Sequence, residues 1–132
     1  MNYAALAGML AVSLVAGCQK DETVSAYGGA DKTWVLHSLD GATFHAQASL
    51  RFPEQGRITG QGPCNSLSAS QNAPYPWFSI GPIASTRRAC PDLNAENAYF
   101  EALKTMTQVE ILGDTMILSD DAGRQMVFKS AP

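Results

Sequence analysis

The chain has 132 residues, which is enough for one globular domain and too few for two of ordinary size. Apolar residues make up 45% of the sequence and charged residues only 16%, a composition typical of a protein with a normal hydrophobic core. The net charge of -3 excludes the basic surface that nucleic-acid binding requires, and it excludes a polybasic patch for anionic membranes.

The first segment of the chain is apolar and ends in a cysteine. Residues 1–18, MNYAALAGMLAVSLVAGC, contain no charged side chain. The apolar run is shorter than the ~20 residues that a membrane-spanning helix needs, and it fits the hydrophobic part of a secretory signal. Its end, from Leu14 to Cys18, resembles the lipobox of bacterial lipoproteins, although the usual Lys or Arg near the start is absent. An ordinary signal peptide or an uncleaved anchor is the alternative.

These features divide the chain into three predicted parts. We expect residues 1–17 to be a lipoprotein signal peptide, after which Cys18 carries the lipid, detectable as palmitate. Residues 18–32 are expected to be the lipidated cysteine and a flexible tether. The tether is predicted because the residues after Cys18 have no apolar periodicity and contain a Gly-Gly pair. Gln19 follows the cysteine where an aspartate would indicate the inner membrane, so the sorting convention favours an outer-membrane anchor that faces the periplasm. Residues 33–130 are expected to form the folded domain.

Strand patterns dominate from Thr33 onward. Residues 33–39 place Trp34 and Leu36 on one face. The next run, residues 43–52, alternates between apolar or small residues and polar ones, as a half-buried strand does. Its expected core-facing residues are Phe44, Ala46, Ala48, Leu50 and Phe52.

Two hairpins are expected in this region. Pairing Leu36 with Phe44 keeps both on the core side, and that parity favours a three-residue turn with Gly41 in the left-handed conformation. The next hairpin should pair Phe52 with Ile58, also on the core side.

The second half of the sequence contains one helix and a meander. Residues 92–107 have helical periodicity, and Asp92 or Asn94 is expected to cap the first turn after a proline. The sequence that follows, residues 109–129, reads as three short strands separated by two turns. The expected core residues of the helix are Leu93, Phe100, Leu103 and either Met106 or Thr107.

These elements predict a mainly β fold, α+β in class. We expect a small antiparallel β-barrel or a strongly curved sheet of about 7–8 strands, with one α-helix at about 92–107 covering an open end or edge.

The ordered motifs resemble those of the META domain (HslJ-like) family of bacterial envelope proteins, over most of the domain. They are W-x-L-x-x-L at 34–39, L-x-F at 50–52, G-R-I-T-G at 56–60, Cys64-Asn65, I-x-x-I-A-S-T-R-R-A-C at 80–90 and E-I-L-G-D-x-M-I-L at 110–118. The chain departs from the family at Pro63, where members often have glycine, and at residues 66–70, where a Gly-x-Tyr is common. The resemblance implies a β-rich envelope domain with one helix, links to stress tolerance, and no particular activity.

Two cysteines remain once Cys18 carries a lipid. An even pair in an oxidising periplasm predicts a disulfide between Cys64 and Cys90. The alternative is a reactive Cys90 thiol, whose pKa would be lowered by Arg87 or Arg88 just upstream. Only one of these arginines would face the thiol, because neighbouring residues in a strand point to opposite faces.

Metal sites are the other alternative. His37 and His45 are expected on one outward face of their hairpin, where they would complete a Cys2His2 set with the two cysteines, at a spacing that matches no standard zinc pattern. Asp114, Asp120 and Asp121 lie at expected turns, and a weak calcium site there is the alternative to a turn role.

The sequence indicates binding rather than catalysis. No serine stands in G-x-S-x-G, and no phosphate-binding loop or dinucleotide fingerprint is present, so we expect no enzyme, no cofactor and no catalytic residue. In residues 77–80, Phe78 and Ile80 share a face from which Trp77 points away. Trp77 and Tyr75 therefore form the candidate binding surface, for an envelope protein or the lipid headgroups. The alternative is that Trp77 packs under a neighbouring loop or the helix.

The expected function is that of a non-catalytic, outer-membrane-anchored periplasmic lipoprotein in envelope maintenance or stress tolerance. Its expected partners are the membrane, through the N-terminal lipid, and an envelope protein. The alternative is an inhibitor or ligand-binding module of the envelope, of the kind that blocks lysozyme or proteases.

Overall fold

The computed structural model describes Gly8 and residues 20–131. The predicted lipobox and its Cys18 lie outside the described residues, so the lipid anchor stays a prediction. Within the described residues, no helix is long and apolar enough to cross a membrane. The elements in chain order are η1 (Val24–Tyr27), β1 (Trp34–Leu39), β2 (Ala42–Thr43), β3 (Ser49–Arg51), β4 (Arg57–Gln61), β5 (Ser66–Ser70), β6 (Ala84–Ser85), α1 (Leu93–Thr105), β7 (Gln108–Leu112), β8 (Thr115–Ser119) and β9 (Gln125–Ser130).

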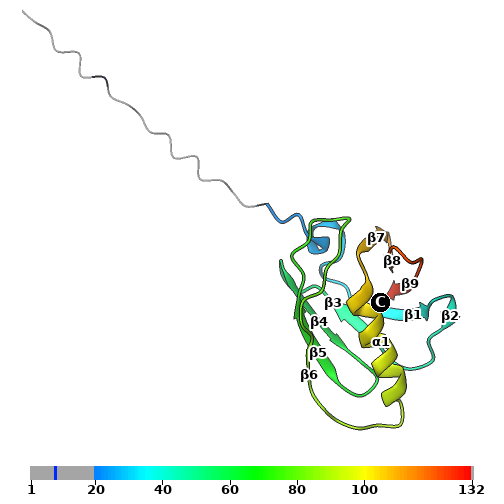
Figure 1. Cartoon of the computed structure of the whole chain (residues 1–132). Helices are drawn as coiled ribbons and strands as arrows, with labels where there is room; N and C mark the ends of the chain where they lie inside the picture. The colour runs from blue at the N-terminus through cyan, green and yellow to red at the C-terminus, as the bar shows by residue number, and fades with distance from the viewer. Residues whose placement is uncertain (1–7, 9–19, 132) are drawn as a thin grey trace, which may run out of the picture.

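The nine strands of the described chain form one antiparallel sheet that curves around α1. The strand order is β6-β5-β4-β3-β1-β9-β8-β7, and β2 pairs with β1 beside this path. Figure 1 shows α1 between the β3–β6 side and the β7–β9 side of the sheet. The prediction of a mainly β fold with a strongly curved sheet and one helix is confirmed. The described residues form nine strands rather than the predicted seven or eight because β2 and β6, each of only two residues, are included.

The sheet stays open, so the barrel alternative was wrong. The end strands β6 and β7 do not pair with each other. Instead, the segment 71–80 closes on itself through an isolated bridge between Gln71 and Ile80, and a second isolated bridge links its Trp77 to Gln108 of β7. A barrel needs a continuous ladder between its first and last strands, and this segment supplies only single contacts.

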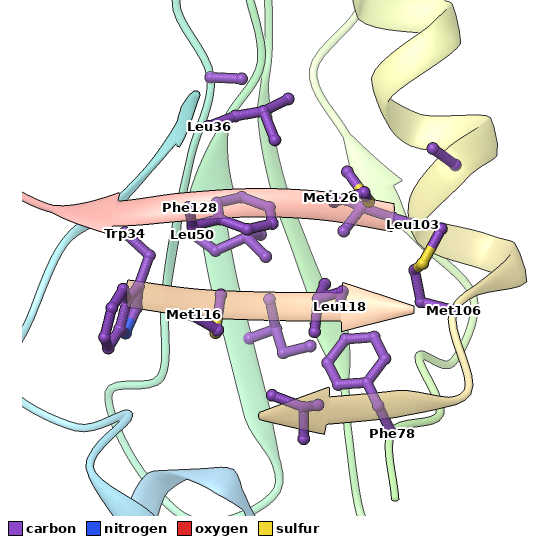
Figure 2. Close-up of a cluster of buried hydrophobic side chains, with 14 of the residues drawn as sticks. Trp34, Leu36, Leu50, Phe78, Leu103, Met106, Met116, Leu118, Met126 and Phe128 are labelled. Carbon is purple, nitrogen blue, oxygen red and sulfur yellow. The ribbon is translucent and has the colours of Figure 1, made fainter. Parts of the chain in front are cut away.

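The predicted alternation gives the core. Side chains from the sheet and from α1 converge in one cluster (Figure 2). Most residues that the pattern placed on the inner face are buried there, Trp34 and Leu50 completely, whereas Phe44 and Ala46 are only partly buried. The labelled members of this cluster are Trp34, Leu36, Leu50, Phe78, Leu103, Met106, Met116, Leu118, Met126 and Phe128.

The first hairpin differs from its prediction. Its turn has two residues, Asp40 and Gly41, both with positive φ (52° and 81°), and Leu39 pairs with Ala42. The predicted three-residue turn was wrong because the pairing of β1 with β9 shifts by one residue between Leu36 and Ser38. After this shift, the later residues of β1 face the opposite side from the one that strict alternation predicts. Gly41 is left-handed, as expected. The second hairpin matches its prediction, since continuing the Arg51–Thr59 register places Phe52 opposite Ile58, both buried.

The helix α1 is shorter than predicted; its buried face matches the prediction at Leu103 and Met106 but differs at the start of the helix. It runs over Leu93–Thr105, and Asp92 stands at its N-cap without a side-chain hydrogen bond. Leu93, expected in the core, is 38% exposed, whereas Glu96 and Tyr99 are buried. Burial raises the pKa of Tyr99, whose hydroxyl donates to the Ser49 carbonyl at 3.0 Å. The start of α1 therefore faces the sheet through a carboxylate rather than through an apolar side chain.

Residues 21–32, predicted to belong to a flexible tether, pack against the domain. Val24 is buried in the core, and the Trp34 indole donates to the Gly29 carbonyl at 3.0 Å. Slight desolvation raises the pKa of Asp21, but hydrogen bonds from Ser25 and Thr23 outweigh it and lower that pKa overall. These local bonds fix the segment without any apolar periodicity, which is why the sequence pattern did not show it.

Candidate functional site

The cysteine pair is a disulfide, as the sequence predicted. Cys64 and Cys90 are bonded, with their Cα atoms 5.6 Å apart and a sequence separation of 26. Neither sulfur is then a thiolate. The reactive-thiol alternative and the Cys2His2 alternative both lose the ligand or nucleophile they require.

A buried carboxylate lies directly beneath this disulfide. Glu96 of α1 is only 3% exposed. Its Oε1 accepts hydrogen bonds from the backbone N–H groups of Cys64 at 3.0 Å and Asn65 at 2.6 Å. Its Oε2 accepts from Asn65 Nδ2 at 2.6 Å. Three donors thus compensate a charge that would otherwise be costly to remove from water.

Asn65 extends this network to the far side of the disulfide loop. Its Nδ2 also donates to the Arg88 carbonyl at 3.0 Å, and its Oδ1 accepts from Thr86 Oγ1 and from the Arg88 backbone. We call Cys64, Asn65, Arg88, Cys90 and Glu96 the disulfide corner. The corner joins α1, the start of β5 and the loop after β6, and the Asn65 side chain bonds the backbone of that loop.

The corner also explains the glycine two positions before Cys64. A Cβ atom at Gly62 would lie 2.5 Å from Glu96 Oε1, so any larger residue would displace the carboxylate. A hollow of about 420 Å³ lies over the corner, lined in part by Arg87, Leu93 and Phe100. Its polar floor, Asn65 and Glu96, is already hydrogen-bonded within the protein. The arrangement is therefore architectural, and Glu96 is the residue that sequence reasoning missed.

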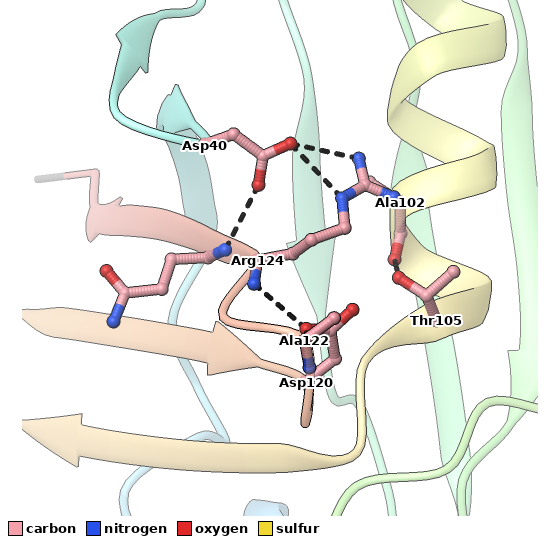
Figure 3. A network of polar contacts seen from close by, with 7 residues as sticks. Asp40, Ala102, Thr105, Asp120, Ala122 and Arg124 are labelled. Atoms are coloured by element: carbon pink, nitrogen blue, oxygen red, sulfur yellow. Dashed lines mark hydrogen bonds and ion pairs between the residues drawn. The ribbon is translucent and has the colours of Figure 1, made fainter.

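The histidines and turn acids take separate places in the fold. His37 and His45 are exposed and line one shallow hollow of about 210 Å³. Asp120 accepts hydrogen bonds from the backbone N–H groups of Ala122 and Arg124, and Asp40 pairs with the Arg124 guanidinium (Figure 3). No group of three or more metal-ligating side chains occurs among the described residues.

Two more acids occupy turns in the same way. Asp114 accepts from Ser130 Oγ at 2.9 Å and lies 3.7 Å from Lys32 Nζ, while Asp121 is exposed in the turn before β9. The turn role predicted for these acids accounts for Asp114 and Asp120 by direct contacts. Their carboxylates serve different turns and do not converge.

The predicted binding residues, Tyr75 and Trp77, lie together on one surface. Tyr75 stacks on Tyr27, with ring centroids 4.7 Å apart and planes at 5°, and its hydroxyl accepts from the Ile111 N–H at 3.1 Å. Trp77 is 53% exposed, although its backbone is held by the bridge to Gln108. As predicted, it points away from the side that buries Phe78.

A groove runs beside these aromatics. It has a volume of about 430 Å³ and is bordered by the segment 75–77 and by residues of β7, β8 and β9. Its lining includes polar side chains, among them Gln108, Glu110 and Gln125, as well as Ile117. Tyr27 belongs to this surface too, and the sequence could not show it because residues 21–32 lacked any strand or helix pattern.

Comparison with known structures gives the same architecture. An NMR structure of a protein from Burkholderia xenovorans matches with a TM-score of 0.64 and 24% identity, covering 82% of this chain and 87% of that one. A crystal structure of a DUF4847 family protein from Bacteroides vulgatus matches with a TM-score of 0.66 and 12% identity, covering 80% and 96%. At these identities the likeness concerns the fold alone.

The family comparison is more specific. No match was found among curated proteins. The family described as "META domain" matches residues 29–132, which includes the ordered motifs, the disulfide corner and the Tyr75–Trp77 surface. The chain therefore belongs to the META domain family.

Proposed function

We propose that this protein is a non-catalytic lipoprotein of the bacterial cell envelope. Cys18 anchors it in the outer membrane, and the META domain faces the periplasm, where it serves envelope maintenance or stress tolerance. The observation that carries the proposal is the Cys64–Cys90 disulfide, because structural disulfides persist in oxidising compartments outside the cytosol. The lipobox-like sequence that ends at Cys18 adds a route to that compartment.

The state of the polar side chains supports a non-catalytic role. A catalytic acid, base or nucleophile needs a polar atom free to meet a substrate. In the disulfide corner, Asn65 and Glu96 are bonded to each other and to backbone groups. The acids Asp40, Asp114 and Asp120 are held in turns and ion pairs.

The lipid anchor is tested at Cys18. Cells grown with labelled palmitate are expected to label the full chain, and the Cys18→Ala variant is expected to remain unlabelled because no sulfur is available for acylation. Trp77→Phe is the matched control and should be labelled like the original chain. A chain without label, or a Cys18→Ala variant that still incorporates it, would contradict the anchor.

A second function is supported by the groove beside Trp77. A half-exposed indole next to a polar-lined groove of about 430 Å³ suits an inhibitor or ligand-binding module of the envelope. We expect the domain to inhibit a lysozyme or an envelope protease and Trp77→Ala to weaken inhibition at least about tenfold, because buried aromatic anchors dominate binding energy.

The control for this second function is Leu93→Ala, which changes an exposed apolar side chain on α1. It should inhibit as well as the original chain. Tyr75→Ala is less informative, since its hydroxyl also bonds β7 and its loss would disturb the fold. Inhibition that is absent, or equal in all variants, would rule out the inhibitor.

A further inference from the structure

The exposed large hydrophobic side chains are not spread evenly over the described chain. They are Tyr27 (50% exposed), Trp77 (53%), Leu93 (38%) and Leu112 (59%). Single exposed apolar residues need no explanation, but neighbouring ones mark a contact surface. All of them except Leu93 lie around Tyr75.

The contacts of Tyr75 show how this group is assembled. Its ring stacks on Tyr27, and its hydroxyl binds the backbone of Ile111, the residue before Leu112. Trp77 follows two residues later and pairs with Gln108 on the same strand, β7. In a strand, Gln108 and Leu112 share a face, and so Trp77 and Leu112 point outward together. We call Tyr27, Tyr75, Trp77 and Leu112 the neck surface.

The neck surface lies beside Glu22, close to the start of the continuous segment 20–131 that the structure describes. The Tyr75 backbone N–H donates to the Glu22 carbonyl at 2.7 Å, which ties the segment before η1 to the middle of the surface. In Figure 1, η1 lies beside the loop between β5 and β6 at this end of the domain. Glu22 comes four positions after Cys18 in the sequence, and four positions reach at most about 14 Å.

From this geometry we infer that the neck surface rests on the lipid headgroups of the membrane that holds Cys18. The inference depends on the proposed anchor and adds what the domain does beside it. An anchor at Cys18 keeps Glu22, which is bonded to Tyr75, within about 14 Å of the lipidated residue, so the aromatics of the neck surface are within reach of the headgroup layer. Tyrosine and tryptophan favour this layer because each has an apolar body and a polar tip.

The charges around the surface specify the kind of lipid. The charges of the Lys32–Asp114 ion pair cancel. The one positive charge of Lys20 is smaller than the summed negative charge of the other carboxylates near the surface. A net negative rim repels anionic headgroups, so the fitting occupant is a zwitterionic leaflet. The contact can be weak and still persist, since the lipid anchor makes docking intramolecular. The unbalanced carboxylates are Asp21, Glu22 and Glu110.

The two tryptophans of the chain allow a direct test. Trp34 is fully buried and Trp77 is half exposed, so only Trp77 can meet lipid. The mature chain is coupled through the Cys18 thiol to maleimide lipids in phosphatidylcholine vesicles, with or without bromine on the acyl chains near the headgroup. The disulfide leaves Cys18 as the single coupling thiol.

We expect the Trp77 emission to shift to shorter wavelength on coupling and to lose intensity in brominated vesicles. Trp77→Phe should abolish the quenching and leave the Trp34 emission. Tyr27→Ser with Leu112→Ser should reduce the quenching, and phosphatidylglycerol in the vesicles should reduce it as well. The matched control Leu93→Ser changes an exposed apolar side chain on α1, outside the neck surface, and should be quenched like the original chain.

Unchanged Trp77 emission in brominated vesicles would overturn the inference. So would a shift that appears only when a soluble saccharide or an envelope protein is added, since the surface would then bind that partner. Chemical coupling does not depend on acylation in the cell. Absence of palmitate labelling with intact quenching would therefore refute the proposed anchor, whereas labelling without quenching would refute only the docking.

Discussion

Glu96→Ala is expected to lower the free energy of unfolding by about 3–5 kcal/mol, a large share of the stability of a domain this size. The substitution removes the acceptor for the N–H groups of Cys64 and Asn65 and for the Asn65 amide. Buried donors left without a partner cost more than the lost bonds themselves. Denaturant titration followed by Trp34 fluorescence measures the change, because that indole is buried in the folded state.

A second acid on the same helix provides the control. Glu101 is exposed and forms an ion pair with Lys104 at 2.9 Å. Glu101→Ala should change the stability by less than about 1 kcal/mol, as exposed pairs usually do. Equal effects of Glu96→Ala and Glu101→Ala would show that the buried carboxylate does not hold the corner.

Removing the disulfide by Cys64→Ser with Cys90→Ser is expected to cost about 3.5 kcal/mol in the chain-entropy model. The bond closes a loop with a sequence separation of 26 residues, and the open loop gives the unfolded chain more conformations. The comparison is made between denaturation midpoints of the original chain and the double variant, each with and without a reducing agent.

Reduction should lower the midpoint of the original chain and leave that of the double variant unchanged. The Ser68→Ala variant, at a half-buried position of β5 outside the corner, serves as the control and should respond to reductant like the original chain. If the original chain were insensitive to reductant while its disulfide was demonstrably broken, the bond would contribute nothing to stability.

The core-facing strand residues could be predicted from the sequence because successive side chains of a strand point to opposite faces, so that buried residues recur at every second position. Trp34, Leu36, Leu50 and Phe52 could all be assigned to the core from alternation alone, and all four are buried. The two-residue turn of the first hairpin could not be predicted in this way, because the register shift in β1 depends on its pairing with β9, which lies far away in sequence.

The disulfide corner was predictable in part. The cysteine count gave the bond, but nothing marked Glu96 as buried, because an acid in the first turn of a helix is ordinarily favoured by the helix dipole in water. Its donors lie 31 and 32 residues earlier. The neck surface was missed at Tyr27 for a similar reason, since its stacking on Tyr75 is a tertiary contact.

The open sheet affects whether copies of the protein crowded on one surface associate through their strand edges. Unpaired strand edges invite pairing between molecules, and proteins held on a surface meet one another often. Here one end strand, β6, has only two residues. The other, β7, is partly covered, because the Val109 N–H donates to the Pro76 carbonyl and the Phe78 N–H donates to the Thr107 carbonyl just before β7. The segment 71–80 thus protects an unclosed sheet from edge-to-edge association, and the domain can remain monomeric at high local density.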